Sequence, residues 1–498
     1  MVANSVRTSL ILVVLVIGLA TASSLLNSDI QLKLKGSYSS ISQSKYQQYP
    51  DIYSAQSSNV QGSFSATLFE TSTTKLLFAG YEGFYAPYPD VYPSAVFYNV
   101  EGGNVVEVSR LSVPAGAGQT NAFVSTTPGN RYVAITRYIP IGFVSPYASH
   151  NFILYIHNYS DAGVIDPVPT LVYNLANLAP ANFYNKSVSY TGLSGISVKG
   201  DVLQVTYAVG LPYLGAITGQ KHALLKVSSD HASVTLSVAV DTLPTGFPSL
   251  YSFPQKTVLF QTCYDNNKYH FVSADNSWNI TSPLGFTASV SSYIFDSVAN
   301  TLVLADSSAV AQYIQGFSVD RKNNIVYAIT NEVSSDGVSV LQFPRVPYVN
   351  NASDKDTELH AWKLNNNGKL DYQGGLELAS DGIQVEPSPN GKYLAVSYAG
   401  IIGNEVQYTS FTGLGNISRV FSPNTVNLYK VKVSPHGVSL NLLDTSSASP
   451  LSFGLAFDAK SKALAVVGQS TYRVLPGGYR VGQKDTQLYD ISDDDEDE

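Results

Sequence analysis

The sequence contains little cysteine, methionine or charge. Of its 498 residues one is cysteine, one is methionine and 13% are charged, and the formal net charge is −8. A single cysteine cannot form an internal disulfide, so no disulfide framework holds the fold. The 44% hydrophobic content is too high for a disordered polymer. The acidic balance gives no basis for nucleic-acid binding, and we expect a folded globular chain without a nucleic-acid partner.

Common catalytic and metal-binding motifs are also missing. The chain has no G-x-S-x-G elbow, no H-E-x-x-H motif, no cysteine pair, no phosphate-binding loop and no dinucleotide fingerprint. Its histidines lack a metal-ligand spacing, so we expect structural or surface roles for them and no bound metal. They are His150, His157, His222, His231, His270, His360 and His436. Cys263 is expected to be a small buried hydrophobe, the alternative being a disulfide to another chain.

Residues 1–22 predict a secretory signal peptide. Arg7 supplies the positive charge, an apolar run covers residues 10–20, and Ala20-Thr21-Ala22 fits a small-residue cleavage site. The alternative is a membrane anchor, but the run is shorter than the roughly 20 apolar residues that span a bilayer. We therefore expect a secreted, extracellular protein with no membrane span in the mature chain, and a single folded domain over residues 23–491.

Five N-x-S/T triplets agree with export. Each one alone is weak, because a chain rich in asparagine and serine forms such triplets by chance. Together with the signal peptide they predict an N-glycoprotein. The acceptors are Asn158, Asn185, Asn279, Asn351 and Asn416.

The chain ends in acidic residues. Positions 493–498 are all Asp or Glu, and we expect residues 492–498 to form a disordered, solvated tail because like charges repel. The alternative is a tail that loads Ca²⁺ or docks a partner, although Ca²⁺ needs about 6–8 oxygen ligands in a fixed cage. We expect no cofactor, with Ca²⁺ as the one exception that the sequence leaves open.

One short unit recurs along the chain. It consists of an alternating strand, a tight polar turn, and a second β-rich strand that ends in a small residue, and in most copies a third and a fourth strand follow. The turns lie 56 to 71 residues apart (130 − 74 and 462 − 391). Their central residues are Thr74, Asn130, Gly200, Lys256, Asn324, Gly391 and Lys462. Seven units of four antiparallel strands, almost without helical periodicity, predict an all-β seven-bladed β-propeller.

Two alternatives affect this fold prediction. A pair of β-sandwiches would also show short strands and turns, but no linker interrupts the middle of the chain. The segment 293–304 resembles a further copy; we place it in the outer hairpin of the fourth blade, whereas as an inner hairpin it would raise the count to eight. We expect residues 30–34 to close the ring by pairing with residues 487–491, because an open ring leaves exposed sheet edges.

Two segments resemble blade motifs of the lactonase and carboxymuconate-cyclase family of seven-bladed propellers. They are residues 385–397, with a Pro-Asn-Gly-Lys turn, and residues 360–370. The resemblance implies catalysis in the central channel, with Glu332 in the pair Asn331-Glu332 as the family-matched acid. The Pro-Arg-His stretch of that family is replaced here by Gln312-Tyr313-Ile314 and by Ser380-Asp381-Gly382, so its basic and imidazole groups are missing.

Tyrosine and proline are concentrated in the connections between second and third strands. In an antiparallel blade these connections leave the disk on the face opposite the inner hairpin turns. Rigid rings with a hydroxyl group suit the binding of sugars or extended peptides, so we predict an extracellular carbohydrate or protein ligand on this face. The alternative is that the rings pack on each other and cover the disk. The candidate ligand-binding residues are Tyr81, Tyr85, Tyr88, Tyr92, Tyr138, Tyr147, Tyr213 and Tyr348.

The sequence thus leaves two functional classes open. The first is a non-catalytic extracellular recognition or matrix protein that uses the Tyr/Pro-rich face. The second is an enzyme similar to lactonases or cycloisomerases, which would need basic or imidazole groups from distant blades to converge on Glu332.

Overall fold

The computed structural model describes residues 30–39, 62–82, 93–112, 118–144, 147–178, 188–196, 202–211, 216–241, 252–261, 267–278, 286–310, 313–331, 357–378, 382–398, 405–410, 413–418, 425–435, 437–449, 452–468, 471–474, 478–481 and 485–493. Regular structure in these residues is almost entirely β, apart from the short 3₁₀ turns η1 (Glu101–Gly103) and η2 (Leu175–Leu178). None of the described helices has the length and apolar character needed to span a membrane.

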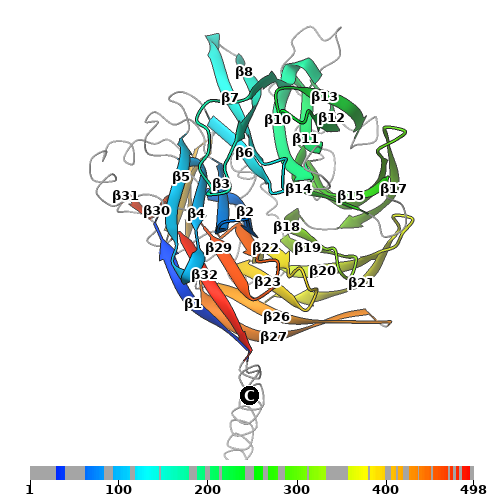
Figure 1. Ribbon diagram of the computed structural model, residues 1–498. Helices are drawn as coiled ribbons and strands as arrows, with labels where there is room; N and C mark the ends of the chain where they lie inside the picture. The colour runs from blue at the N-terminus through cyan, green and yellow to red at the C-terminus, as the bar shows by residue number, and fades with distance from the viewer. Residues whose placement is uncertain are drawn as a thin grey trace, which may run out of the picture.

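Seven four-stranded antiparallel sheets form the blades of a propeller (Figure 1). The strands of each blade are given from the inner to the outer one. Blade 1 is β2 (Gly62–Glu70), β3 (Lys75–Glu82), β4 (Pro93–Asn99) and β5 (Val106–Ser112), and blade 2 is β6 (Gly118–Ser125), β7 (Tyr132–Val144), β8 (Tyr147–Asn158) and β9 (Leu171–Asn174). Blade 3 is β10 (Val188–Ile196), β11 (Val202–Leu211), β12 (Ala216–Val227) and β13 (Val234–Asp241), and blade 4 is β14 (Ser252–Gln261), β15 (Lys268–Trp278), β16 (Phe286–Asp296) and β17 (Thr301–Val310).

The remaining blades follow the same order. Blade 5 is β18 (Tyr313–Asp320), β19 (Ile325–Asn331), β20 (Glu358–Leu364) and β21 (Leu370–Glu377); blade 6 is β22 (Gly382–Pro387), β23 (Tyr393–Tyr398), β26 (Thr425–Ser434) and β27 (Gly437–Ser447); blade 7 is β28 (Gly454–Phe457), β29 (Ala463–Val467), β32 (Thr486–Asp493) and β1 (Ile30–Tyr38). Two extra hairpins, β24 (Glu405–Ser410) with β25 (Gly413–Ser418) and β30 (Thr471–Val474) with β31 (Gly478–Val481), lie between the second and third strands of blades 6 and 7. The all-β, seven-bladed prediction is confirmed.

The ring closes as the sequence predicted. Strand β1 pairs antiparallel with β32, and the register runs from Ile30 opposite Asp493 to Leu34 opposite Tyr489. The strand therefore extends to Asp493 and includes the first two residues of the expected acidic tail. On its other side the backbone N–H of Leu32 donates to Asp444 Oδ2 of blade 6 at 2.7 Å. This contact occupies a donor on an edge strand that would otherwise be open to another chain.

One of the seven predicted turns is wrong. Lys256 lies inside β14 opposite Ala274, and β15 begins only at Lys268. The polar stretch around Pro254 forms a register shift in a continuous inner strand, because proline cannot donate a ladder hydrogen bond and is tolerated at edges and bulges.

The segment 293–304 belongs to β16 and β17, the outer hairpin of blade 4, so the number of blades is seven and not eight.

The hydrophobic core is divided among the spaces between blades. Each pair of adjacent blades encloses its own buried apolar cluster. Between blades 1 and 2, for example, Phe78 and Phe97 pack with ring centroids 5.3 Å apart, and both side chains are 0% exposed. Burial of apolar side chains between blades therefore stabilises the disk.

Candidate functional site

The two faces of the disk differ in their connections. Short turns such as 71–74, 321–324, 365–369 and 458–462 join first to second and third to fourth strands, and we call the surface they form the turn face. The other connections join strands at the opposite face, which we call the connection face. Some of its chain segments are long: 332–357 joins β19 to β20, and both extra hairpins belong to this face. Function concentrates on loops that a rigid scaffold positions, so the connection face is the candidate functional surface.

The structure describes three of the predicted ligand-binding tyrosines, and two of them lie on an extension of blade 2. Tyr138 lies on β7 opposite Phe152, and Tyr147 begins β8 opposite Val144, so both belong to the long ribbon that blade 2 extends from the disk (Figure 1). Tyr81 is the penultimate residue of β3 and differs from the expectation, because it is only 1% exposed and packs in the core between blades 7 and 1. The others lie outside the described residues: Tyr85, Tyr88, Tyr92, Tyr213 and Tyr348.

A polar aromatic cluster surrounds Tyr81 at the edge of blade 1. The Tyr81 and Tyr98 hydroxyls share a hydrogen bond of 3.2 Å. Nearby, Tyr38 donates to Glu107 Oε2 at 3.0 Å, and Arg110 donates to both carboxylate oxygens of Glu107 at 2.9 and 2.6 Å. Burial raises the pKa of Tyr98 well above its usual range, and burial together with Glu107 raises the pKa of Tyr38. At neutral pH these phenols stay protonated, so they act as hydrogen-bond donors and not as bases.

Arg137 is a second polar group that the sequence pattern did not single out. It is 7% exposed in the middle of β7, with its guanidinium 5.0 Å from the centroid of the Tyr155 ring and Nη2 3.4 Å from the carbonyl of Ser112 in blade 1. Burial lowers its pKa, but a guanidinium keeps its proton at neutral pH. The signal available in the sequence is one arginine inside the apolar run 132–139, in a chain with only 29 Lys and Arg.

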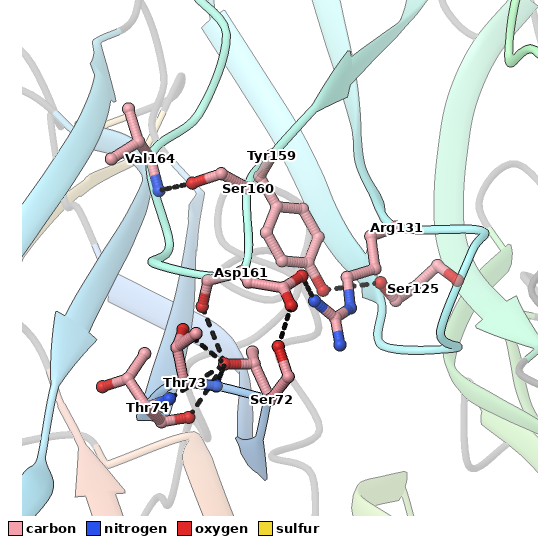
Figure 2. A network of polar contacts seen from close by, with 10 residues as sticks. Ser72, Thr73, Thr74, Ser125, Arg131, Tyr159, Ser160, Asp161 and Val164 are labelled. Carbon is pink, nitrogen blue, oxygen red and sulfur yellow. Dashed lines mark hydrogen bonds and ion pairs between the residues drawn. The ribbon is translucent and has the colours of Figure 1, made fainter.

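Polar side chains of the turn face bind neighbouring blades. Figure 2 shows the link between blades 1 and 2, where the Thr71 hydroxyl donates to the carbonyl of Asp161 at 2.7 Å. The Asp161 carboxylate also accepts from Ser72 and forms an ion pair with Arg131. Behind them the buried Tyr159 donates to the carbonyl of Ser125 at 2.8 Å.

Similar links join other blades on the turn face. Lys75 of blade 1 forms a 2.9 Å ion pair with the buried carboxylate of Asp458 in blade 7. Asn323 of blade 5 donates to the carbonyl of Gly391 in blade 6 at 2.9 Å, and the backbone N–H of Asn390 donates to Ser461 of blade 7 at 3.1 Å. These polar groups therefore serve to link neighbouring blades of the ring.

The described histidines are mostly structural. His157, His222, His231 and His270 are buried, with exposures between 0% and 7%. Burial lowers the pKa of His157 and His231, and lowers that of His270 to about 4. His360 differs, because it binds exposed side chains at the rim of blade 5. No group of three or more His, Cys, Asp or Glu that could hold a metal occurs in the part of the chain that the structure describes.

The structure describes only some of the remaining predicted sites. Asn158 lies at the end of β8, where its Oδ1 is 2.6 Å from His231 Nδ1, and Asn416 lies on β25. Asn185, Asn279 and Asn351 lie outside the described residues, as do the signal peptide and Cys263. Glu332 also lies outside them, directly after the last residue of β19.

Similarity to known proteins is found among solved structures. No protein-family model and no curated protein matches the sequence. Among solved structures, a chain of a mitotic checkpoint complex is 9% identical, with 86% of this chain and 90% of that chain covered and a TM-score of 0.42. A candidate 6-phosphogluconolactonase of Bacteroides uniformis is 12% identical over 87% and 100% of the two chains, with a TM-score of 0.42.

A second candidate 6-phosphogluconolactonase, from Bacteroides fragilis, is 11% identical, covers 79% of this chain and 98% of its own length, and has a TM-score of 0.35. The chain is a seven-bladed propeller by its own strand order. Two of these three neighbours are candidate 6-phosphogluconolactonases.

Proposed function

We propose that this protein is a secreted, N-glycosylated recognition or matrix propeller that binds an extracellular carbohydrate or protein ligand without catalysing a reaction. The binding surface is the connection face above blades 1 and 2. The observation that carries the proposal is the difference between the two faces: polar groups of the turn face link blades, whereas the other face bears the long connections and, on the blade 2 ribbon, Tyr138 and Tyr147.

The chemistry of blades 1 and 2 supports binding rather than proton transfer. The Tyr38 phenol stays protonated, and Glu107 already accepts hydrogen bonds from Arg110 and Tyr38. Arg137 places a permanent positive charge at the base of the ribbon that carries Tyr138 and Tyr147. Aromatic rings with neutral donors and a guanidinium suit an oxygen-rich ligand such as an oligosaccharide.

Binding to a panel of immobilised oligosaccharides tests the proposal. The mature protein is compared with a variant that carries Tyr85→Ala, Tyr88→Ala and Tyr92→Ala together. Lys460→Ala is the matched control, because its side chain is 69% exposed on the turn face. We expect capture of at least one oligosaccharide, loss of capture in the tyrosine variant with an unchanged melting temperature, and no change in the control. If the tyrosine variant fails to fold, or binds as well as the parent, the rings pack on the disk and the proposal fails.

A further inference from the structure

A connected group of hydroxyl, imidazole and carboxylate side chains lies on the outer half of blade 5. His360 on β20 has one ring nitrogen, Nδ1, 3.0 Å from the Tyr372 hydroxyl. Its other ring nitrogen, Nε2, is 3.2 Å from Glu358 Oε2 and 3.1 Å from the Thr330 hydroxyl. Tyr372 thus supplies a hydroxyl, His360 a base beside it, and Glu358 an acid that orients the base.

The partners of His360 fix its tautomer. A carboxylate can only accept a hydrogen bond, so Nε2 carries the proton and donates toward Glu358. The unprotonated Nδ1 then accepts from the Tyr372 hydroxyl. Burial lowers the pKa of His360, against the opposing effect of Glu358, so the imidazole is neutral at pH 7 and can receive a proton. The pKa of Tyr372 is raised by burial and by Glu358, so its hydroxyl needs such a base to react.

Local backbone geometry brings Tyr372 to the imidazole. The register of β20 and β21 shifts so that Ala361 faces Gly374 and Trp362 faces Tyr372, which leaves Gln373 as an extra residue. Gly375 lies opposite His360, and a Cβ there would come within 3.1 Å of the Tyr372 hydroxyl and 3.4 Å of His360 Nδ1. Because Gly375 has no Cβ, the Tyr372 hydroxyl and His360 Nδ1 have room to form their hydrogen bond.

The two ends of the group are accessible, whereas its centre is enclosed. Tyr372 is 56% exposed and the Glu358 side chain is 48% exposed, but that of His360 is only 13% exposed. Trp362 is 2% exposed and supports both rings, with centroids 5.7 Å from His360 and 5.6 Å from Tyr372. A rigid support of this kind holds the base in position beside an accessible hydroxyl.

We propose that Tyr372 is a nucleophile, activated by His360 and oriented through Glu358, that accepts acyl groups from activated esters. Tyr372 Oη attacks the acyl carbonyl carbon while its proton passes to His360 Nδ1, and the Nε2–H bond to Glu358 stabilises the imidazolium. The bond between the carbonyl carbon and the leaving oxygen then breaks, and the leaving group takes the electron pair and the proton from His360. The products are an acyl ester of Tyr372 and a free alcohol or phenol.

Acetylation by p-nitrophenyl acetate tests this site. We expect a burst of p-nitrophenol close to one equivalent, and a single acetyl group on Tyr372 by peptide mass spectrometry. Tyr372→Phe should abolish the burst, His360→Gln should slow it about 100-fold as expected for loss of a positioned base, and Glu358→Gln about 10-fold. Tyr173→Phe, which removes a phenol from the outer strand of blade 2, should leave the burst unchanged.

Glu358→Gln keeps the test valid if His360→Gln does not fold, because the Glu358 side chain is half exposed. Acetyl groups spread over several lysines and tyrosines would overturn the proposal. It would also be overturned by an acetylation rate that Tyr372→Phe and Glu358→Gln leave unchanged in folded protein. The site is on another blade from the proposed ligand face, so either proposal can fail without the other.

Discussion

Single buried histidines make the stability of this fold depend on pH. His270 is 4% exposed, and burial lowers its pKa from 6.5 to about 4. Between these values the unfolded chain binds a proton that the folded chain excludes, so stability is fully present above pH 6.5 and is lost as the pH falls toward 4. His157 and His231 act in the same direction.

We predict that His270→Gln weakens this pH dependence. The loss of unfolding free energy between pH 7 and pH 4 should become smaller by about 3 kcal/mol, the equivalent of one histidine with its pKa lowered this far. Denaturant unfolding of parent and variant at both pH values measures the difference. An identical loss in the two proteins would show that burial does not lower the pKa of His270 in the folded state.

Asn158 is expected to have a structural role whether or not it carries a glycan. Its side chain holds His231, which also contacts Asn130 and has a left-handed backbone with φ of 59°. Asn158→Ala should destabilise the chain by about 1–3 kcal/mol, because it removes a partner of a buried imidazole. Ser160→Ala removes the same N-x-S triplet without removing a His231 partner. Equal destabilisation by both changes, in protein made without glycosylation, would contradict this role.

At the scale of elements, the turns fix how closely the blades pack. Gly368 and Gly129 both have positive φ, 81° and 77°. A Cβ at Gly368 would lie 2.5 Å from Ala305 Cβ of blade 4, whereas a Cβ at Gly129 would have no atom within 4 Å. We predict that Gly368→Ala destabilises the protein by about 1–3 kcal/mol more than Gly129→Ala. Both variants place alanine at a positive φ, but only the new Cβ at position 368 overlaps a neighbouring blade. Thermal unfolding of the two variants measures this difference, and equal melting temperatures would contradict it.

The sequence predicted the elements better than the contacts between them. Alternating strands and polar turns were enough to place most inner hairpins and the closing strand, because these depend on local pattern and edge pairing. Lys256 was misplaced because a proline bulge and a turn have similar composition. Arg137 and the group around His360 were missed because their partners come from other strands or blades, and Tyr372 reaches His360 only through a register shift.

At the scale of the whole molecule, ring closure by β1 should control stability. Ile30 and Leu32 are buried between blades 6 and 7, and their removal would lose about 3–6 kcal/mol of apolar burial and open the edge of β32. A chain that lacks residues up to 38 should therefore unfold at a melting temperature at least about 5 °C lower and should aggregate on heating. An unchanged melting temperature in the truncated chain would mean that the ring does not need this strand.

The most direct measurement of the central claim is a thermal-shift comparison of the mature protein with oligosaccharides, simple lactones and Ca²⁺. A ligand that binds only the folded state raises the melting temperature by mass action. The account predicts a shift with an oligosaccharide that disappears when Tyr85, Tyr88 and Tyr92 are replaced by alanine. A shift with a lactone alone, followed by turnover that Glu332→Gln abolishes, would contradict it and make the protein an enzyme of the central channel.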